Sequence, residues 1–290
     1  MSTLNFNKNH GKSILPQWTR NIPEGEYHRQ AQQGIVVTST MLKQFRACPT
    51  LYHAIVHGTE KVEQKAAFRF GRAVHKIILE GEDACQAEFI VGGPLNEKTG
   101  RSFSHGSRAF ARWLEDYGLS PEKILTPAEA RDIRSMRDSV RRHRAAASLL
   151  ADGWPERCAE AEIAGLLCRA RFDWLRRDGM IVDLKTTADI GRFEADARRF
   201  GYLNQFAFYR DVALAAGAGD VAVAAVVLEK RSPYRVGVWE FSPDVLAPYA
   251  AQNLTALKAL ARCREQNRWP TGYEGARSFP PAGLPPLWLN

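Results

Sequence analysis

Apolar positions recur at helical spacing soon after the start of the chain, once an aperiodic polar stretch has ended. Residues 1–35 are polar, contain Pro and Gly, and show no period. The apolar positions of MLKQF then predict a helix from about Ser39 to Gly58 that Pro49 interrupts. We therefore expect a flexible N-terminal arm over 1–35 and a single folded domain over 36–290.

Three further helices are predicted in the first half of the chain. The first covers about 68–79, where the apolar positions of VHKII form a stripe, and it stops near Gly81. The other two cover 107–117 and 127–150, after a loop over 92–106 that is rich in Gly, Ser and Asn. The last of these helices is long and rich in arginine, with one apolar side.

The hydrophobic period falls to two between residues 158 and 187, which predicts paired strands. On the first of these strands, alternation puts two sets of residues on opposite faces. One face carries Leu166, Cys168, Ala170, Phe172 and Trp174, and the other carries Arg169, Arg171 and Asp173. Asp178-Gly179 predicts a tight type I′ hairpin turn, which needs positive φ at both central positions. On the returning strand MIVDLKTT, Ile181, Asp183 and Lys185 share a face.

The remaining pattern alternates between helix and strand. We expect a helix over 194–216, strands over 221–229 and 234–241, and a final helix from Pro243 to about residue 268. A proline-rich tail, FPPAGLPPLWLN, should lie extended over the body. The order helices, three strands, helix, two strands, helix predicts an α/β domain with a mixed central sheet.

Charge and hydropathy narrow the classes of partner. Lys and Arg total 40 against 32 Asp and Glu, and the net charge of +8 suits a polyanionic partner such as nucleic acid. No segment approaches the roughly 18 apolar residues of a membrane helix. The N-terminal residues lack the apolar core of a secretory signal. We therefore expect a cytoplasmic protein with no membrane association.

Cysteine and glycine motifs exclude several classes of site. The five cysteines are scattered without a CxxC pair, which argues against a zinc knuckle and against a disulfide framework. Only Cys263 lies in the C-terminal region, so a cysteine-held iron–sulfur cluster is not expected. The pattern GxxxxGK[ST] does not occur, so we expect no strand opening driven by ATP hydrolysis.

The predicted hairpin gathers the residues with the clearest chemistry. It brings Asp173 and Asp183 side by side and places Lys185 on the same face as Asp183. Hard carboxylates suit Mg²⁺ or Mn²⁺, which gain further ligands from phosphate, and Lys185 could orient or deprotonate a water or stabilise charge on the phosphate. An exposed hairpin with an ordinary Asp183–Lys185 ion pair is the alternative interpretation. Burying both charges in this mostly apolar strand would be costly without a purpose.

Four segments, in order, resemble the PD-(D/E)XK nucleases and, among these, the RecE-type (exonuclease VIII) phage and prophage exonucleases. They are TSTMLKQFRACPTLYHA (38–54), FGRAVHKIIL (70–79), RARFDWL followed by IVDLKTT, and GYLNQFAFYRDVA (201–213). The closing RWPTGYEG and LPPLWLN are also similar, so the resemblance covers residues 36–290. It implies a restriction-endonuclease-like fold with extra N-terminal helices.

The resemblance implies a role for each matching residue. The metal ligands would be His75, Asp173, Asp183 and the backbone carbonyl of Leu184. Lys185 would be the catalytic lysine, and Gln205 and Tyr209, four apart on one helix face, would line the active site. Without the resemblance, a single histidine on an amphipathic helix and a Gln–Tyr pair are ordinary structural features. Asp183 takes the place that Glu often holds, which the motif allows.

Other charged residues of the predicted strands are candidates for supporting roles. Arg169 and Arg171 share the predicted face with Asp173 and could contact scissile or terminal phosphates. Glu160 and Glu162 precede the catalytic strands and could join a second metal shell, although simple strand-edge carboxylates are the alternative interpretation.

The implied function is hydrolysis of DNA phosphodiesters with Mg²⁺, for which Mn²⁺ could substitute. The RecE resemblance further implies 5′→3′ action on double-stranded ends that leaves single strands for recombination. It also implies a RecT-like single-strand annealing partner and a ring-shaped homo-oligomer. Two alternatives stay open: a RecB-like or structure-specific endonuclease, and a non-catalytic DNA-binding module. The second alternative conflicts with the presence of Asp173, Asp183 and Lys185 together.

Overall fold

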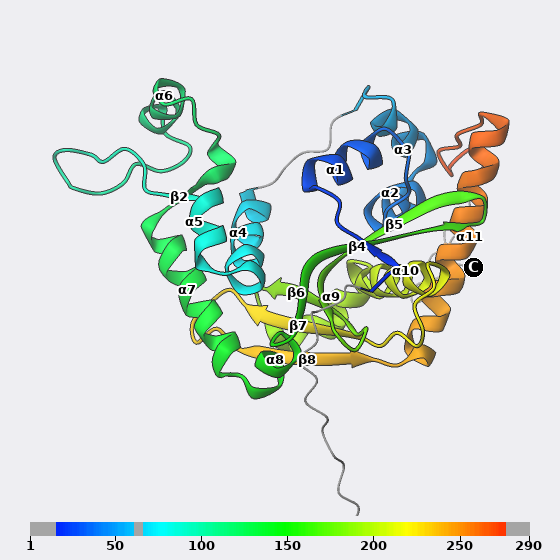
Figure 1. The fold of residues 1–290 in the computed structure, drawn as a ribbon. Coiled ribbons are helices and arrows are strands. Elements are labelled where there is room, and N and C mark those ends of the chain that lie inside the picture. Colours follow the sequence, from blue (N-terminus) through cyan, green and yellow to red (C-terminus); the bar gives the residue numbers. More distant parts are fainter. Residues whose placement is uncertain (1–15, 61–65, 277–290) are drawn as a thin grey trace, which may run out of the picture.

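A mixed six-stranded sheet forms the centre of the computed structural model, which describes residues 16–60 and 66–276 (Figure 1). The strands follow the order β1 (Thr19–Arg20), β4 (Gly153–Ile163), β5 (Leu166–Arg176), β6 (Ile181–Thr187), β7 (Val223–Glu229) and β8 (Val236–Phe241). Only β6 and β7 pair in parallel, and the other neighbours are antiparallel. The predicted mixed sheet is therefore confirmed. A small parallel pair, β2 (Ile90–Val91) and β3 (Ile124–Leu125), lies apart from it.

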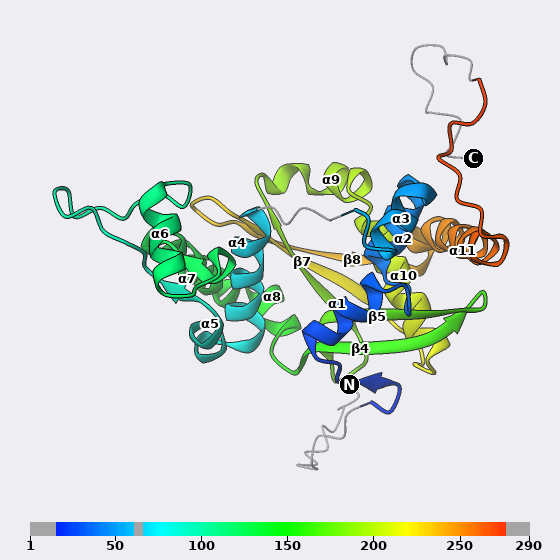
Figure 2. The ribbon, with the colours of Figure 1, turned by 90° about the horizontal axis from the view of Figure 1, so that it is seen from above.

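Two groups of helices lie on either side of the strands (Figures 1 and 2). One group is α1 (Glu24–Gln32), α2 (Ser39–Ala47), α3 (Pro49–Val56), α9 (Phe193–Arg199), α10 (Tyr202–Ala215) and α11 (Pro243–Gln266). The other is α4 (Ala66–His75), α5 (Glu82–Glu88), α6 (Arg108–Asp116), α7 (Pro127–Arg142) and α8 (Arg144–Leu149). Each group encloses its own hydrophobic core against the sheet. No helix in the described ranges is both long and apolar enough to span a bilayer.

Two predicted helices are each divided in the structure. The helix expected over 194–216 breaks between α9 and α10 at Gly201, whose φ of 73° favours glycine. The helix expected over 127–150 breaks at His143, which leaves the helical region and caps α8 through its ring nitrogen, the acceptor for the amide of Ala146. In both places the apolar period continues across the break, so the pattern alone does not reveal it.

The strand β6 has the predicted faces, whereas β5 departs from its prediction at one residue. Ile181 packs in the core on the α10 side, and Val182 and Leu184 pack in the core on the α7 side. On β5 the alternation holds through Phe172, but Trp174 lies in the core on the α7 side. The prediction for Trp174 is therefore wrong, because the alternation shifts by one residue between Phe172 and Leu175, which both lie in the core on the α10 side. The shift falls where β4 opposite carries the positive φ of Glu156.

The hairpin between β5 and β6 forms at the predicted residues with a different turn. Gly179 has a φ of 88°, and Asp178 is not among the residues with positive φ, so this is not a type I′ turn. The amide of Gly179 donates to the carbonyl of Arg176, and the amide of Arg176 donates to the carbonyl of Met180. The Asp178 carboxylate accepts from the Met180 amide, which stabilises the wider loop without a second positive φ.

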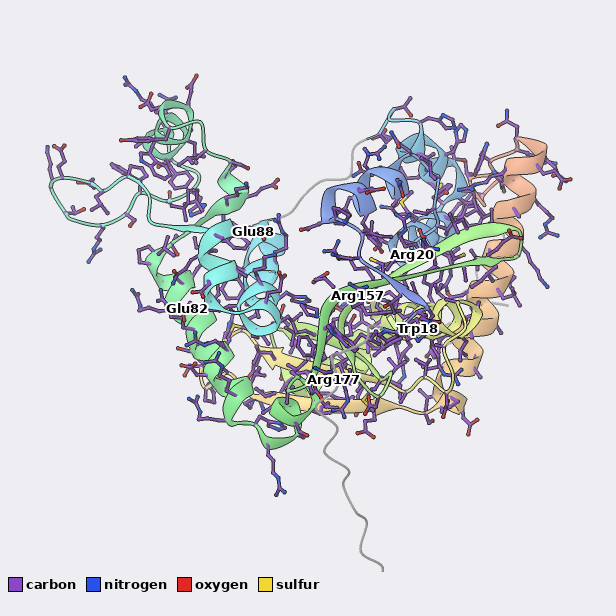
Figure 3. All side chains as sticks on the ribbon, viewed as in Figure 1. Trp18, Arg20, Glu82, Glu88, Arg157 and Arg177 are labelled. Carbon is purple, nitrogen blue, oxygen red and sulfur yellow. The ribbon has the colours of Figure 1, made fainter. Side chains whose placement is uncertain are left out.

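Residues 16–35 form regular structure instead of the predicted arm. Thr19 and Arg20 pair with β4. Trp18, labelled in Figure 3, meets the ring of Phe172 edge-on, with ring centres 6.0 Å apart. Helix α1 buries Tyr27 against the β4–β5 hairpin. These contacts are non-local, so an aperiodic sequence can acquire order from them. The first part of the arm, and the tail predicted to lie over the body, fall outside the described residues.

Gly153, at the start of β4, lies against the neighbouring strand β5. A Cβ there would collide with the backbone carbonyl of Leu175 and with the indole of Trp174. Gly153→Ala is therefore expected to destabilise the protein by about 1–3 kcal/mol, measured by urea unfolding. Gly219→Ala, where no atom lies within 4 Å of the added Cβ, is the matched control. Equal stability of the two variants would contradict this packing.

Candidate active site

His75 lies at the junction where α4 ends and a π-helical turn, Lys76–Glu80, begins. Such π-turns often occur at functional sites because they change the direction of side chains along a helix. The His75 Nδ1 atom lies 3.5 Å from the Asp173 Oδ2 atom on β5. The ring also forms a hydrogen bond with the backbone of Leu184 on β6. The structure therefore joins the predicted helix residue to both predicted strands.

Asp173 lies where β5 and β6 separate. Pairing of these strands covers only Trp174 with Val182 and Leu175 with Ile181. Just beyond it, the amide of Leu184 donates to the Asp173 Oδ2 atom at 2.8 Å. The separation thus opens space between the two strands and brings Asp173 to the backbone of Leu184.

Asp183 and Lys185 form a buried ion pair on the α10 side of β6. The Lys185 Nζ atom lies 2.5 Å from Asp183 Oδ2, and the Asp183 side chain is only 1% exposed. The same Nζ atom lies 4.9 Å from the ring centre of Tyr202 on α10, a cation–π contact. The alternative of an exposed hairpin with a surface ion pair does not describe this arrangement.

Burial and neighbouring charges perturb each of the titratable groups here. Burial, reinforced by the Asp173 charge, raises the pKa of Asp183 to about 6. Burial also raises the pKa of Asp173, although Lys185 and the Leu184 amide oppose it. Burial and the Lys185 charge lower the pKa of His75, which favours the neutral imidazole. Burial opposes the charged form of Lys185, but the two aspartates outweigh it and raise its pKa.

Gln205 and Tyr209 are brought together on α10, as their spacing predicts. The Gln205 Nε2 atom donates to the Tyr209 hydroxyl at 2.6 Å. Tyr209 is buried against Phe172, with ring centres 5.6 Å apart. Burial, with a smaller contribution from Asp183, raises the pKa of Tyr209. This pair therefore packs beside the site as neutral hydrogen-bonding groups.

Arg169 and Arg171 lie beneath α1. Arg169 is 5% exposed, and its guanidinium donates to Glu160 and to Gln30, each at 2.6 Å. Arg171 lies 5.6 Å from the ring centre of Tyr27. One nitrogen of each guanidinium, Nη1, has no hydrogen-bond partner in the described part of the chain. A phosphate contact by either arginine would therefore require α1 to move.

Glu156 on β4 lies at the site, although the sequence analysis did not single it out. Pro155 pairs with Trp174 and Arg157 with Phe172, so Glu156 lies opposite Asp173. It forms an ion pair with Arg171. Burial, followed by the Asp173 charge, raises its pKa. Glu156 has a φ of 56°, which no periodicity predicts.

The two glutamates considered for a second metal shell, with simple strand-edge carboxylates as the alternative, lie elsewhere. Glu160 forms ion pairs with Arg169 and Arg20, and Glu162 is exposed near the far end of β4. Figure 3 shows Arg20 beside this part of the hairpin. The register explains the difference, because the strand position opposite Asp173 belongs to Glu156.

The donor atoms fit a hard divalent cation, although they are not arranged around a common point. Within residues 16–60 and 66–276, no group of three His, Cys, Asp or Glu side chains stands ready to hold a metal ion. The Asp183 Oδ1 atom is buried and has no hydrogen-bond partner there. A buried carboxylate oxygen without a partner is costly, and a cation would satisfy it. Two aspartates, a neutral imidazole and a backbone carbonyl suit Mg²⁺ or Mn²⁺.

Comparisons with known proteins agree with this architecture. The family described as "PDDEXK-like domain of unknown function (DUF3799)" matches residues 38–279. The crystal structure of "Putative exonuclease" from Eubacterium rectale is similar, with a TM-score of 0.64 at 13% identity, covering 91% of this chain and 100% of that one. No curated protein matches the chain. The predicted restriction-endonuclease-like fold is confirmed.

Proposed function

The chain belongs to the PDDEXK-like family whose model matches residues 38–279, and this family lies within the PD-(D/E)XK nuclease superfamily that the sequence resembles. From that premise we propose that the chain is a metal-dependent deoxyribonuclease. One observation carries the proposal: Asp173, Asp183 and Lys185 meet His75 and the Leu184 backbone in one buried cluster. Buried charges of this kind are costly and are retained mainly where chemistry requires them.

The chain's own residues divide the work of phosphodiester hydrolysis. Asp173, Asp183, the Leu184 carbonyl and neutral His75 would hold a divalent metal. When bound, this metal supplies neutralisation of phosphate charge and activation of water. Lys185 remains protonated because its pKa is raised, so its ammonium group stabilises negative charge on the phosphate instead of removing a proton.

Gln205 and Tyr209 have a positioning role in this proposal. Tyr209 stays neutral because its pKa is raised, so its hydroxyl can accept from Gln205 and still donate a proton to another oxygen. That oxygen would belong to water or to the DNA backbone. Arg169 and Arg171 would contact phosphate only after α1 moves away from the β4–β5 hairpin.

The finer assignment is a 5′→3′ exonuclease on double-stranded DNA ends that uses Mg²⁺, with Mn²⁺ as a substitute. The RecE-type resemblance supports it, and the similar structure from Eubacterium rectale carries the name "Putative exonuclease". The same resemblance supports a role in recombination with a RecT-like annealing protein, and a ring-shaped homo-oligomer around DNA.

This function is tested by comparing the degradation of two substrates. One is linear duplex DNA labelled at the 5′ or the 3′ end, and the other is a closed circular duplex. Cleavage is expected with Mg²⁺ and not with EDTA, on linear DNA and not on the circle, with the 5′ label released first. Cutting of the circle would instead favour a structure-specific or RecB-like endonuclease. Folded protein that cleaves no substrate with Mg²⁺ or Mn²⁺ would favour the non-catalytic DNA-binding module.

A further inference from the structure

A cavity of about 260 Å³ lies between α3 and the end of α11. Its walls come from α3, from the turn after α1, from Arg264 near the end of α11 and from Trp269 just beyond it. Figures 1 and 2 show α3 beside this end of α11. None of the lining residues belongs to the catalytic cluster, so the cavity is a separate feature of the fold.

Four aromatic rings line this cavity. The ring centres of Trp269 and His53 lie 4.6 Å apart, and those of Trp269 and Tyr52 lie 6.0 Å apart with the ring planes inclined by 29°. The ring centre of His57, one helical turn beyond His53, lies 4.1 Å from that of His53. Flat rings grouped in this way provide a surface on which planar aromatic ligands stack.

Hydrogen bonds hold the walls of the cavity together. The Arg264 Nη2 atom donates to the Tyr52 hydroxyl at 2.9 Å and to the Gly34 carbonyl at 3.0 Å. The Thr50 hydroxyl donates to the Trp269 carbonyl at 2.7 Å, which fixes the segment after α11 against α3. Three segments that are far apart in the sequence are therefore joined around the cavity, so it exists before any ligand binds.

The charges around the cavity favour an anionic ligand. Among the described residues that line it, none is Asp or Glu. Residues 262–268 contain three arginines and one glutamate, and Arg262 and Arg268 are exposed. Burial and the nearby His57 lower the pKa of His53, so its imidazole is neutral at pH 7 and can both donate and accept a hydrogen bond. A ligand that combines planar rings with negative charge fits these properties.

Single-stranded nucleic acid is a ligand of this kind. In a duplex the faces of each base are covered by its neighbours, whereas an unpaired base can turn outward and stack on Trp, Tyr or His. The cavity is smaller than the pockets of about 300–1,000 Å³ that hold drug-sized ligands, so its volume suits one base.

We propose that this cavity binds an unpaired nucleobase of single-stranded DNA, stacked against Trp269, with the arginines of residues 262–268 beside the flanking phosphates. The inference rests on the proposed function, because a nuclease that degrades one strand of a duplex end leaves the other strand unpaired. The cavity gives that strand a place on the enzyme outside the active site.

Fluorescence anisotropy of a short labelled oligo(dT), in EDTA so that no cleavage occurs, measures this binding on the full-length protein. The matched ligand has the same number of phosphates but abasic sites in place of the thymines. The wild type is expected to bind oligo(dT) about 5–150-fold more tightly than the abasic strand. Trp269→Ala should lose most of this preference, and Trp269→Phe should keep part of it. Trp113→Ala, at a half-buried tryptophan of α6, is the control and should bind as the wild type does.

Two results would overturn the base site: equal affinity of the wild type for the two strands, or an unchanged preference in Trp269→Ala. Loss of the preference in Trp113→Ala as well would show that it does not come from this cavity, and would also overturn it. Circular dichroism and the melting temperature establish that each variant is folded. Cleavage of linear duplex DNA with Mg²⁺ tests the nuclease proposal separately, so a wild type that cleaves the duplex but lacks the preference overturns only the base site.

Discussion

Lys185→Ala is expected to lower the rate of metal-dependent DNA cleavage by about 10²–10³-fold. Lys185 is protonated, buried and 2.5 Å from Asp183, so it is the cation best placed to meet charge that develops on a phosphate held at the site. The loss should appear in kcat with little change in KM, because the interaction strengthens only as charge develops. Single-turnover cleavage of end-labelled duplex DNA measures it.

Mn²⁺ binding distinguishes this role from a structural one. Lys185 competes with a metal for the Asp183 Oδ2 atom, so its removal should preserve or increase Mn²⁺ affinity while cleavage is lost. A collapsed site would lose both. Lys258→Ala, at an exposed lysine of α11, is the control and should cleave normally. Wild-type cleavage rates in Lys185→Ala would remove Lys185 from the mechanism.

The arrangement of β6 shows how far local pattern predicts this site. Strict alternation over MIVDLKTT predicts that Asp183 and Lys185 share a face, and the structure places both on the α10 side. The i, i+4 spacing of Gln205 and Tyr209 likewise predicts their contact on α10. Both relations depend only on the geometry of one regular element, which is the part of a fold that sequence period encodes.

Glu156 and Tyr27 show why other parts escape such prediction. Glu156 reaches the site through the β4–β5 register and a positive φ, neither of which leaves a periodic signal. Tyr27 belongs to a polar, aperiodic segment that is ordered by contact with Arg171, far along the chain. The position of α1 over the hairpin arginines is therefore a tertiary property, and it changes what Arg169 and Arg171 can contact.

Asp183→Asn is expected to abolish cleavage and yet stabilise the folded protein in EDTA. Burial raises the pKa of Asp183 from 3.8 to about 6, so the ionised side chain is disfavoured in the folded state despite Lys185. Such a shift lowers the free energy of unfolding by about 2–3 kcal/mol at pH values above the pKa values of both the folded and the unfolded state. The neutral amide avoids that cost, but it removes a charged metal ligand. Calorimetric melting in EDTA and cleavage with Mg²⁺ measure the two effects.

The pH dependence of this stabilisation tests its cause. Because the folded-state pKa is raised, the contribution of Asp183 to stability is fully present below pH about 4 and is lost as pH rises through about 6. The difference in the free energy of unfolding between Asp183→Asn and wild type should therefore be near zero at pH 4 and largest above pH about 6. Asp220→Asn, at a carboxylate whose side chain is 95% exposed, should show no such trend. An Asp183→Asn protein less stable than wild type at pH 7 would mean that the Asp183–Lys185 ion pair outweighs the cost of burying the Asp183 carboxylate. The cluster would then hold no destabilising negative charge for a metal to neutralise.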